Sequence, residues 1–132
     1  MAQLKIDRSV DGEAVSPELR PLLEAVYNEI ARRPANLNGL WESLDRLLVY
    51  LASPMGRTNS NCWAANNFFL LCEGWETDWD HLPNSFGDIL GDMAKALHDT
   101  VEAPEIARNF ESTPEQLLER LRAIKIKSDE YA

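Results

Sequence analysis

The chain has 132 residues, a length typical of one domain that buries a core without needing a disulfide or a metal. Its 22 acidic and 13 basic residues give a formal net charge of −9, which opposes binding to nucleic acid or to an anionic membrane. The charge favours a basic partner, or it serves solubility alone, as in most acidic proteins. No apolar run approaches the ~20 residues of a membrane span, and residues 1–15 lack the continuous apolar segment of a secretory signal. We therefore expect a cytoplasmic protein.

The two cysteines, Cys62 and Cys72, predict no disulfide. They fall in one helical pattern, where ten residues correspond to ~15 Å along the helix axis, too far for a disulfide bond. Neither cysteine belongs to a Cys-x-x-Cys pair, so the sequence does not indicate a zinc site. Both are expected to be reduced, buried thiols.

The first helical pattern follows a polar lead-in at residues 1–15. Between residues 16 and 34, apolar side chains recur at the three- and four-residue spacing of an amphipathic helix. Ser16, followed by a proline, is a good helix start, and Pro34 ends the pattern.

The second helical pattern, at residues 35–54, is the clearest one. It carries a broad apolar stripe made of Leu37, Leu40, Trp41, Leu44, Leu47, Leu48 and Leu51. Asn36 or Asn38 is available as the N-cap, and the sequence Ser-Pro-Met-Gly at residues 53–56 breaks the pattern.

Within this second pattern, the sequence NLNGLWESL at residues 36–44 resembles a short piece of barstar-type ribonuclease inhibitors. The resemblance implies a small acidic protein that blocks a basic enzyme with its carboxylates. It covers nine residues, and the parallel strands of that fold are absent from the pattern of this chain. We therefore assign neither membership nor site residues from it.

The third helical pattern, at residues 58–74, starts at Thr58 or Ser60 and stops at Gly74. Its centre, at residues 68–71, is apolar on every side. This composition predicts the most enclosed helix of the domain.

Four asparagines mark the same helix. We assign Asn59 and Asn61 to the capping turn at its start. Asn66 and Asn67 lie in its middle, where asparagine is a poor helix former. Each of these two either faces solvent or satisfies backbone groups inside the bundle, and a ligand contact is the alternative.

An acidic, tryptophan-containing stretch, CEGWETDWDHLP at residues 72–83, follows the third helix. Between Arg57 and Lys95 there are six acidic residues and no lysine or arginine. Such a segment can present carboxylates and aromatic anchors to a basic groove. The residues predicted to bind a partner are Glu73, Trp75, Glu76, Asp78, Trp79 and Asp80. The alternative is a connector whose tryptophans pack inward onto the bundle.

Three further helical patterns lie at residues 83–101, 103–110 and 112–127, and residues 128–132 form a short tail. The first of them places Phe86, Leu90, Met93, Leu97 and Val101 on one face. The last opens on a Ser-Thr-Pro-Glu sequence, which is typical of a capped helix start.

The fourth pattern also carries the only arrangement of carboxylates and histidine that suggests a metal site. Asp88, Asp92 and Asp99 share one face, with Lys95 among them at the spacing of exposed ion pairs. A di-metal bundle would repeat Glu-x-x-His on paired helices, and this chain lacks that repeat. We expect a salt-bridged, solvated face, with His98 interacting with the carbonyls or the dipole at the helix end.

The sequence thus predicts a single domain over residues 1–132, an all-α bundle of five or six helices. The favoured function is binding of another protein, as an inhibitor or immunity-type neutraliser of a basic partner. This reading includes no catalytic residue, cofactor, metal, nucleic acid or membrane. One alternative is a metal-dependent hydrolase that uses Asp88, Asp92 and His98. Another is a self-associating structural module, in which an apolar helix face forms a homodimer interface.

Overall fold

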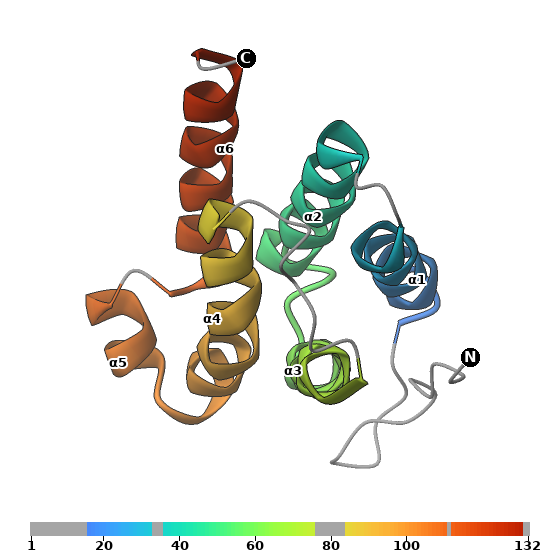
Figure 1. The fold of residues 1–132 in the computed structure, drawn as a ribbon. Helices are drawn as coiled ribbons and strands as arrows, with labels where there is room; N and C mark the ends of the chain where they lie inside the picture. Colours follow the sequence, from blue (N-terminus) through green and yellow to red (C-terminus); the bar gives the residue numbers. More distant parts are fainter. Residues whose placement is uncertain (1–15, 33–35, 76–83, 111, 131–132) are drawn as a thin grey trace.

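The computed structural model describes residues 16–32, 36–75, 84–110 and 112–130, except for the side chains of 70–91, 124 and 126–130. This part of the chain is a bundle of helices without strands, which confirms the predicted all-α class (Figure 1). The helices are α1 (Leu19–Ala31), α2 (Leu37–Ala52), α3 (Asn59–Trp75), α4 (Asn84–Glu102), α5 (Pro104–Asn109) and α6 (Pro114–Glu130). The lead-in at residues 1–15 lies outside the described residues.

Two sets of helices build the bundle. α2 lies between α1 and α6 and packs against both (Figure 1). α3 packs mainly on α4, and α4 also contacts α5 and α6. Across the described part of the chain, no helix combines the length and the apolar character needed to cross a bilayer.

The core is made of leucines and two phenylalanines. Its largest members are Leu19, Leu23, Ile30, Leu40, Leu44, Leu47, Leu48, Leu51, Phe68 and Phe69. The rings of Phe68 and Phe69 meet edge to face, with centroids 4.9 Å apart. Both are fully buried, as expected for the apolar centre of this helix. Each buried side chain of this size stabilises the fold by roughly 2 kcal/mol through burial of apolar surface.

The starts of α2, α3 and α6 follow local sequence rules, whereas α1 begins at Leu19, three residues after the predicted Ser16, and has no side-chain cap. Asn36, one of the two predicted caps of α2, accepts a hydrogen bond from the Gly39 N–H at 3.1 Å. Thr58 caps α3 by accepting from the Asn61 N–H at 3.1 Å. At α6, Thr113 and Gln116 exchange hydrogen bonds between side chain and backbone, which is a capping box.

The helix ends differ slightly from the predicted ones. α3 runs one residue past Gly74, and α6 continues to Glu130, into the stretch expected to form a tail. No proline or glycine interrupts the chain between Glu115 and its end, so nothing local stops α6 earlier. Pro21 lies in the first turn of α1, where its missing N–H would have had no partner within the helix.

Asn61 lies in the capping turn of α3, as predicted, and its side chain also ties α3 to the start of α1. Its side chain is fully buried. The Asn61 amide donates to Ser16 Oγ at 3.0 Å and to the Gly56 carbonyl at 2.9 Å, and its Oδ1 accepts from the Ser16 N–H at 3.1 Å. Gly56 itself is required there, because a Cβ would lie 2.0 Å from the Tyr50 carbonyl oxygen. The amide thus joins α1, the α2–α3 turn and α3.

The contact between α2 and α6 combines apolar and polar groups. The indole Nε1–H of Trp41 donates to the backbone oxygen of Leu121 at 3.2 Å. Arg122 forms an ion pair with Asp45, with 2.9 Å between Nε and Oδ2. These bonds set how α6 lies along α2, since each joins one defined position on either helix.

Candidate functional site

The predicted recognition residues surround the connection between α3 and α4. Glu73 and Trp75 lie in the last turn of α3, and their side chains are outside the described residues. Glu76, Asp78, Trp79 and Asp80 lie wholly outside them, as does His81. The role predicted for these residues therefore stays a prediction, and the helices on either side define where the segment leaves and rejoins the bundle.

Asn66, which precedes this connection in the chain, joins α3 to α4. Its side chain is buried, and its amide donates to the Ala94 carbonyl at 2.5 Å. Asn67 is exposed. Asn66 thus satisfies a backbone group inside the bundle, and Asn67 faces solvent. These are the two structural roles predicted for the pair.

His98 joins the same two helices on the solvent side. Its ring meets Trp63 edge to face, with centroids 5.2 Å apart, and its Nδ1 lies 3.1 Å from Asp99 Oδ1. Lys95 donates to Asp99 Oδ2, the ion pair that the four-residue spacing predicts. A hydrogen bond from Lys95 and, to a smaller extent, one from His98 hold the pKa of Asp99 below its ordinary value of 3.8. The polar partner of His98 is Asp99, where a carbonyl or dipole contact was expected.

Asp92 pairs with a different helix from the one expected. Its Oδ2 accepts from Arg120 Nη2 of α6 at 3.2 Å, whereas its sequence neighbour Lys95 bonds elsewhere. The hydrolase alternative requires Asp92 to work with Asp88 and His98. The side chain of Asp88 is outside the described residues, and those of Asp92 and His98 form separate contacts.

Cys62 is buried, as predicted, and its thiol is a weak nucleophile. Burial raises the pKa of its thiol from 9.0 to about 11, although the charge of nearby Arg57 lowers it and that of Glu115 raises it further. A thiol with this pKa is almost fully protonated at neutral pH and is not an effective nucleophile. Cys72 belongs to the same helix, and its side chain is outside the described residues.

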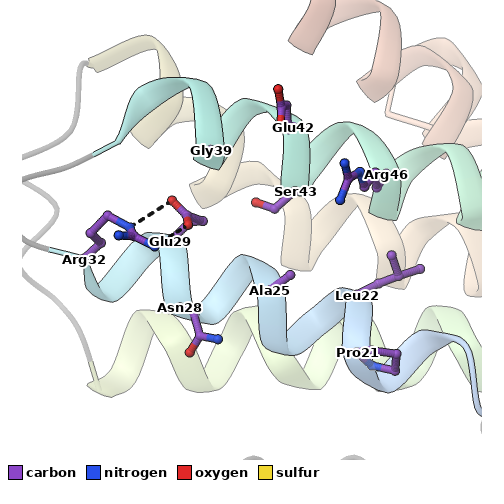
Figure 2. Close-up of a pocket in the computed structure, with 10 residues that line it drawn as sticks. All are labelled: Pro21, Leu22, Ala25, Asn28, Glu29, Arg32, Gly39, Glu42, Ser43 and Arg46. Carbon is purple, nitrogen blue, oxygen red and sulfur yellow. Dashed lines mark hydrogen bonds and ion pairs between the residues drawn. The ribbon is translucent and has the colours of Figure 1, made fainter.

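A pocket of about 490 Å³ lies between α1 and α2 (Figure 2). Glu29 and Arg32 form an ion pair at one end of it, with 2.9 Å between Oε1 and Nη2. Gly39 of α2 leaves room for the Glu29 carboxylate, because a Cβ at residue 39 would lie 2.5 Å from Glu29 Oε2. On the α2 side, the Ser43 hydroxyl donates to the Leu40 carbonyl at 2.9 Å. Each of these two bonds lies within a single helix or its end, and Glu29 is the charged group that lies close to the other helix, beside Gly39.

Two contacts and one exposed ring were not predicted. Arg120 reaches Asp92 across 28 residues, and Trp63 reaches His98 across 35, distances at which periodicity carries no information. Phe110 is 75% exposed. Its signal was present, because it is a single apolar residue between polar neighbours after a short helix.

Among the described residues, no group of three or more histidine, cysteine, aspartate and glutamate side chains converges as metal ligands would. The polar side chains described above either form bonds between helices or line open pockets. Comparisons of this chain with models of protein families, with curated proteins and with solved structures found no match.

Proposed function

We propose that the chain acts in the cytoplasm by binding a basic protein, as an inhibitor or neutraliser of that protein. The contact surface is the acidic segment at residues 73–92. Glu73, Glu76, Asp78 and Asp80 attract the partner electrostatically, and Trp75 or Trp79 serves as the anchor.

The observation that carries the proposal is the charge pattern of the chain. The 37 residues between Arg57 and Lys95 contain six carboxylates and no lysine or arginine. A segment of one sign on a chain of net charge −9 raises the encounter rate with a basic protein and suppresses encounters with acidic ones.

Ion pairs offset several of the carboxylates outside residues 73–80. They are the pairs Arg20–Glu24, Arg32–Glu29, Arg57–Glu115 and Arg122–Asp45. These carboxylates are already offset by neighbouring positive charge. Within the acidic segment, Asp92 is offset in the same way by Arg120, which concentrates the expected recognition on residues 73–80.

The test compares two variants of equal net charge. In the first, Glu73, Glu76, Asp78 and Asp80 are all replaced by lysine. In the second, four exposed acidic residues on other helices are replaced by lysine, namely Glu42, Glu102, Glu105 and Glu119. Circular dichroism first establishes that both variants fold. Each is then used for capture from a lysate of the source cells at low salt, and captured basic proteins are purified and titrated.

We expect the first variant to lose a basic protein that the original chain and the second variant retain. The measured affinity of that protein should fall steeply as salt rises, because solvent-exposed charges are screened over ~10 Å at 0.1 M ionic strength. Equal loss in both variants would mean that overall charge alone drives the association. Retention in both would show that residues 73–80 are not the contact surface.

A further inference from the structure

A second pocket, of about 340 Å³, lies between α4 and the turn that joins α5 to α6. Its size is at the lower end of small-molecule sites. It is lined by Asp92, Lys95, Ala96, Asp99, Phe110, Ser112 and Arg120. Four of these side chains are charged, two of each sign, so the cleft combines both charges with an aromatic ring.

The cleft still offers both hydrogen-bond acceptors and hydrogen-bond donors to a ligand. Asp99 already accepts one bond on each oxygen, from Lys95 on Oδ2 and from His98 on Oδ1. Asp92 accepts from Arg120 through Oδ2, and its Oδ1 has no partner among the described residues. Lys95 and Arg120 each use one N–H on a carboxylate, out of three and five donors respectively. An acceptor and several donors therefore remain available to a ligand.

Phe110 is exposed on a turn that its backbone bonds hold in place. Its N–H donates to the Ile106 carbonyl at 3.1 Å, and the Ser112 N–H donates to the Ala107 carbonyl at 2.8 Å. The Ser112 hydroxyl also donates to the Phe110 carbonyl at 3.1 Å. These bonds hold the backbone at Phe110 and at Ser112, so a ligand that covers the ring does not first have to order these two residues.

The charge balance selects the class of ligand. A simple anion is repelled by Asp92, by Asp99 and by the net negative charge of the chain. A simple cation is repelled by Lys95 and Arg120. A zwitterion satisfies both signs at once. We propose that this cleft binds a free α-amino acid with an apolar side chain. Its carboxylate lies against Arg120 and Lys95, its ammonium group donates to Asp92 Oδ1, and its side chain covers Phe110.

The cleft contains none of residues 73–80 and shares only Asp92 with the acidic segment, so ligand binding is tested separately from binding of the proposed protein partner. The probe is L-phenylalanine, titrated into the ¹⁵N-labelled full chain while the backbone amide shifts of Ala96 and Ser112 are followed. A ligand of about a dozen non-hydrogen atoms in an open cleft should bind with a Kd of roughly 1 mM. L-phenylalaninamide lacks the carboxylate and N-acetyl-L-phenylalanine lacks the ammonium group. Each should bind at least about fivefold more weakly, since a charge-assisted hydrogen bond is lost.

Two variants with matched controls locate the site. Asp92→Asn and Phe110→Ala should each raise the Kd at least about fivefold, by removing the carboxylate for the ammonium group and the ring for the side chain. Glu105→Gln and Ile106→Ala change an exposed charge and an exposed apolar residue on α5 outside the cleft, and should leave the Kd unchanged.

Three results would overturn the proposal. One is the absence of a saturable shift up to about 20 mM L-phenylalanine, far above the expected Kd. Another is equal binding of the amino acid and its two blocked analogues, which would show that the charged groups are not recognised. The third is an unchanged Kd in Asp92→Asn when the spectrum shows that this variant is folded.

Discussion

At the scale of single residues, Cys62 shows how burial controls chemistry. The neutral thiol packs inside the bundle, and the thiolate would have to lose its hydration there, so burial raises its pKa from 9.0 to about 11. The folded-state value lies above the unfolded one. The stability that belongs to the neutral thiol is therefore fully present below about pH 9 and is lost as the pH rises toward 11.

We predict that, as the pH rises from 9 to 11, the free energy of unfolding falls less in Cys62→Ala than in the original chain. The shift in pKa corresponds to about 2–3 kcal/mol in the free energy of unfolding across this range. Urea unfolding at several pH values measures it in both proteins. The comparison concerns the slope with pH, because the substitution also changes packing at every pH. Parallel slopes would contradict a thiol pKa raised by folding.

Residues whose partners are near in sequence were predictable. Asn36 was one of two caps proposed for α2, and the bond between Lys95 and Asp99 follows from their spacing. The bond between Asn61 and Ser16 was not predicted, because Ser16 lies 45 residues away and only packing brings the two together. A buried amide and a capping amide look alike in a single sequence, since both are asparagines beside a helix start.

At the scale of helices, the contact between α3 and α4 includes a buried polar bond beside apolar side chains of the core. The Asn66 amide donates to the Ala94 carbonyl, while Asn67 beside it faces solvent. Adjacent asparagines of one helix thus occupy opposite environments, which provides a matched pair of sites for the same substitution.

We predict that Asn66→Asp costs about 3 kcal/mol or more in the free energy of unfolding. The change keeps the shape of the side chain but places a buried carboxylate against a carbonyl oxygen. Asn67→Asp should change stability by no more than about 0.5 kcal/mol, as expected of an exposed position. Urea denaturation at pH 7 measures both. At lower pH, part of the loss in Asn66→Asp should return, because a protonated carboxyl donates a hydrogen bond. Equal effects of the two substitutions would contradict the burial of Asn66.

The helices themselves were largely predictable, because their apolar residues repeat with the period of a helix and their starts carry capping residues. The end of α6 was predicted too early, as its basic residues at 125–127 gave the impression of a terminal turn. How the helices pack was not predictable. The contact of α2 with α6 joins segments about 80 residues apart through Trp41 and Leu121, and no local pattern encodes it.

At the scale of the whole molecule, the net charge of −9 opposes compaction. Salt weakens this repulsion and also weakens the ion pairs within and between helices. The pairs involve partly or largely exposed side chains, such as Lys95 at 76% and Arg122 at 54%, and pairs of this kind contribute little to stability. Relief of repulsion should therefore outweigh the loss of ion pairs.

We predict that the melting temperature rises by about 3–6 °C between low ionic strength and ~0.5 M NaCl at pH 7, equivalent to about 1 kcal/mol. Differential scanning calorimetry measures it. The control is the same experiment near the isoelectric point of 4.6, where the net charge vanishes and the rise should disappear. A melting temperature that falls with salt at pH 7 would show that the ion pairs outweigh the repulsion.

The buried amide of Asn61 also has an evolutionary consequence. It bonds to Ser16 and to the carbonyl of Gly56, a position where no larger residue fits. A change at residue 61 alone would strand the other groups inside the bundle. In descendants of this sequence, positions 16 and 61 should therefore be replaced together or not at all, Gly56 should be retained, and the exposed Asn59 and Asn67 should vary freely.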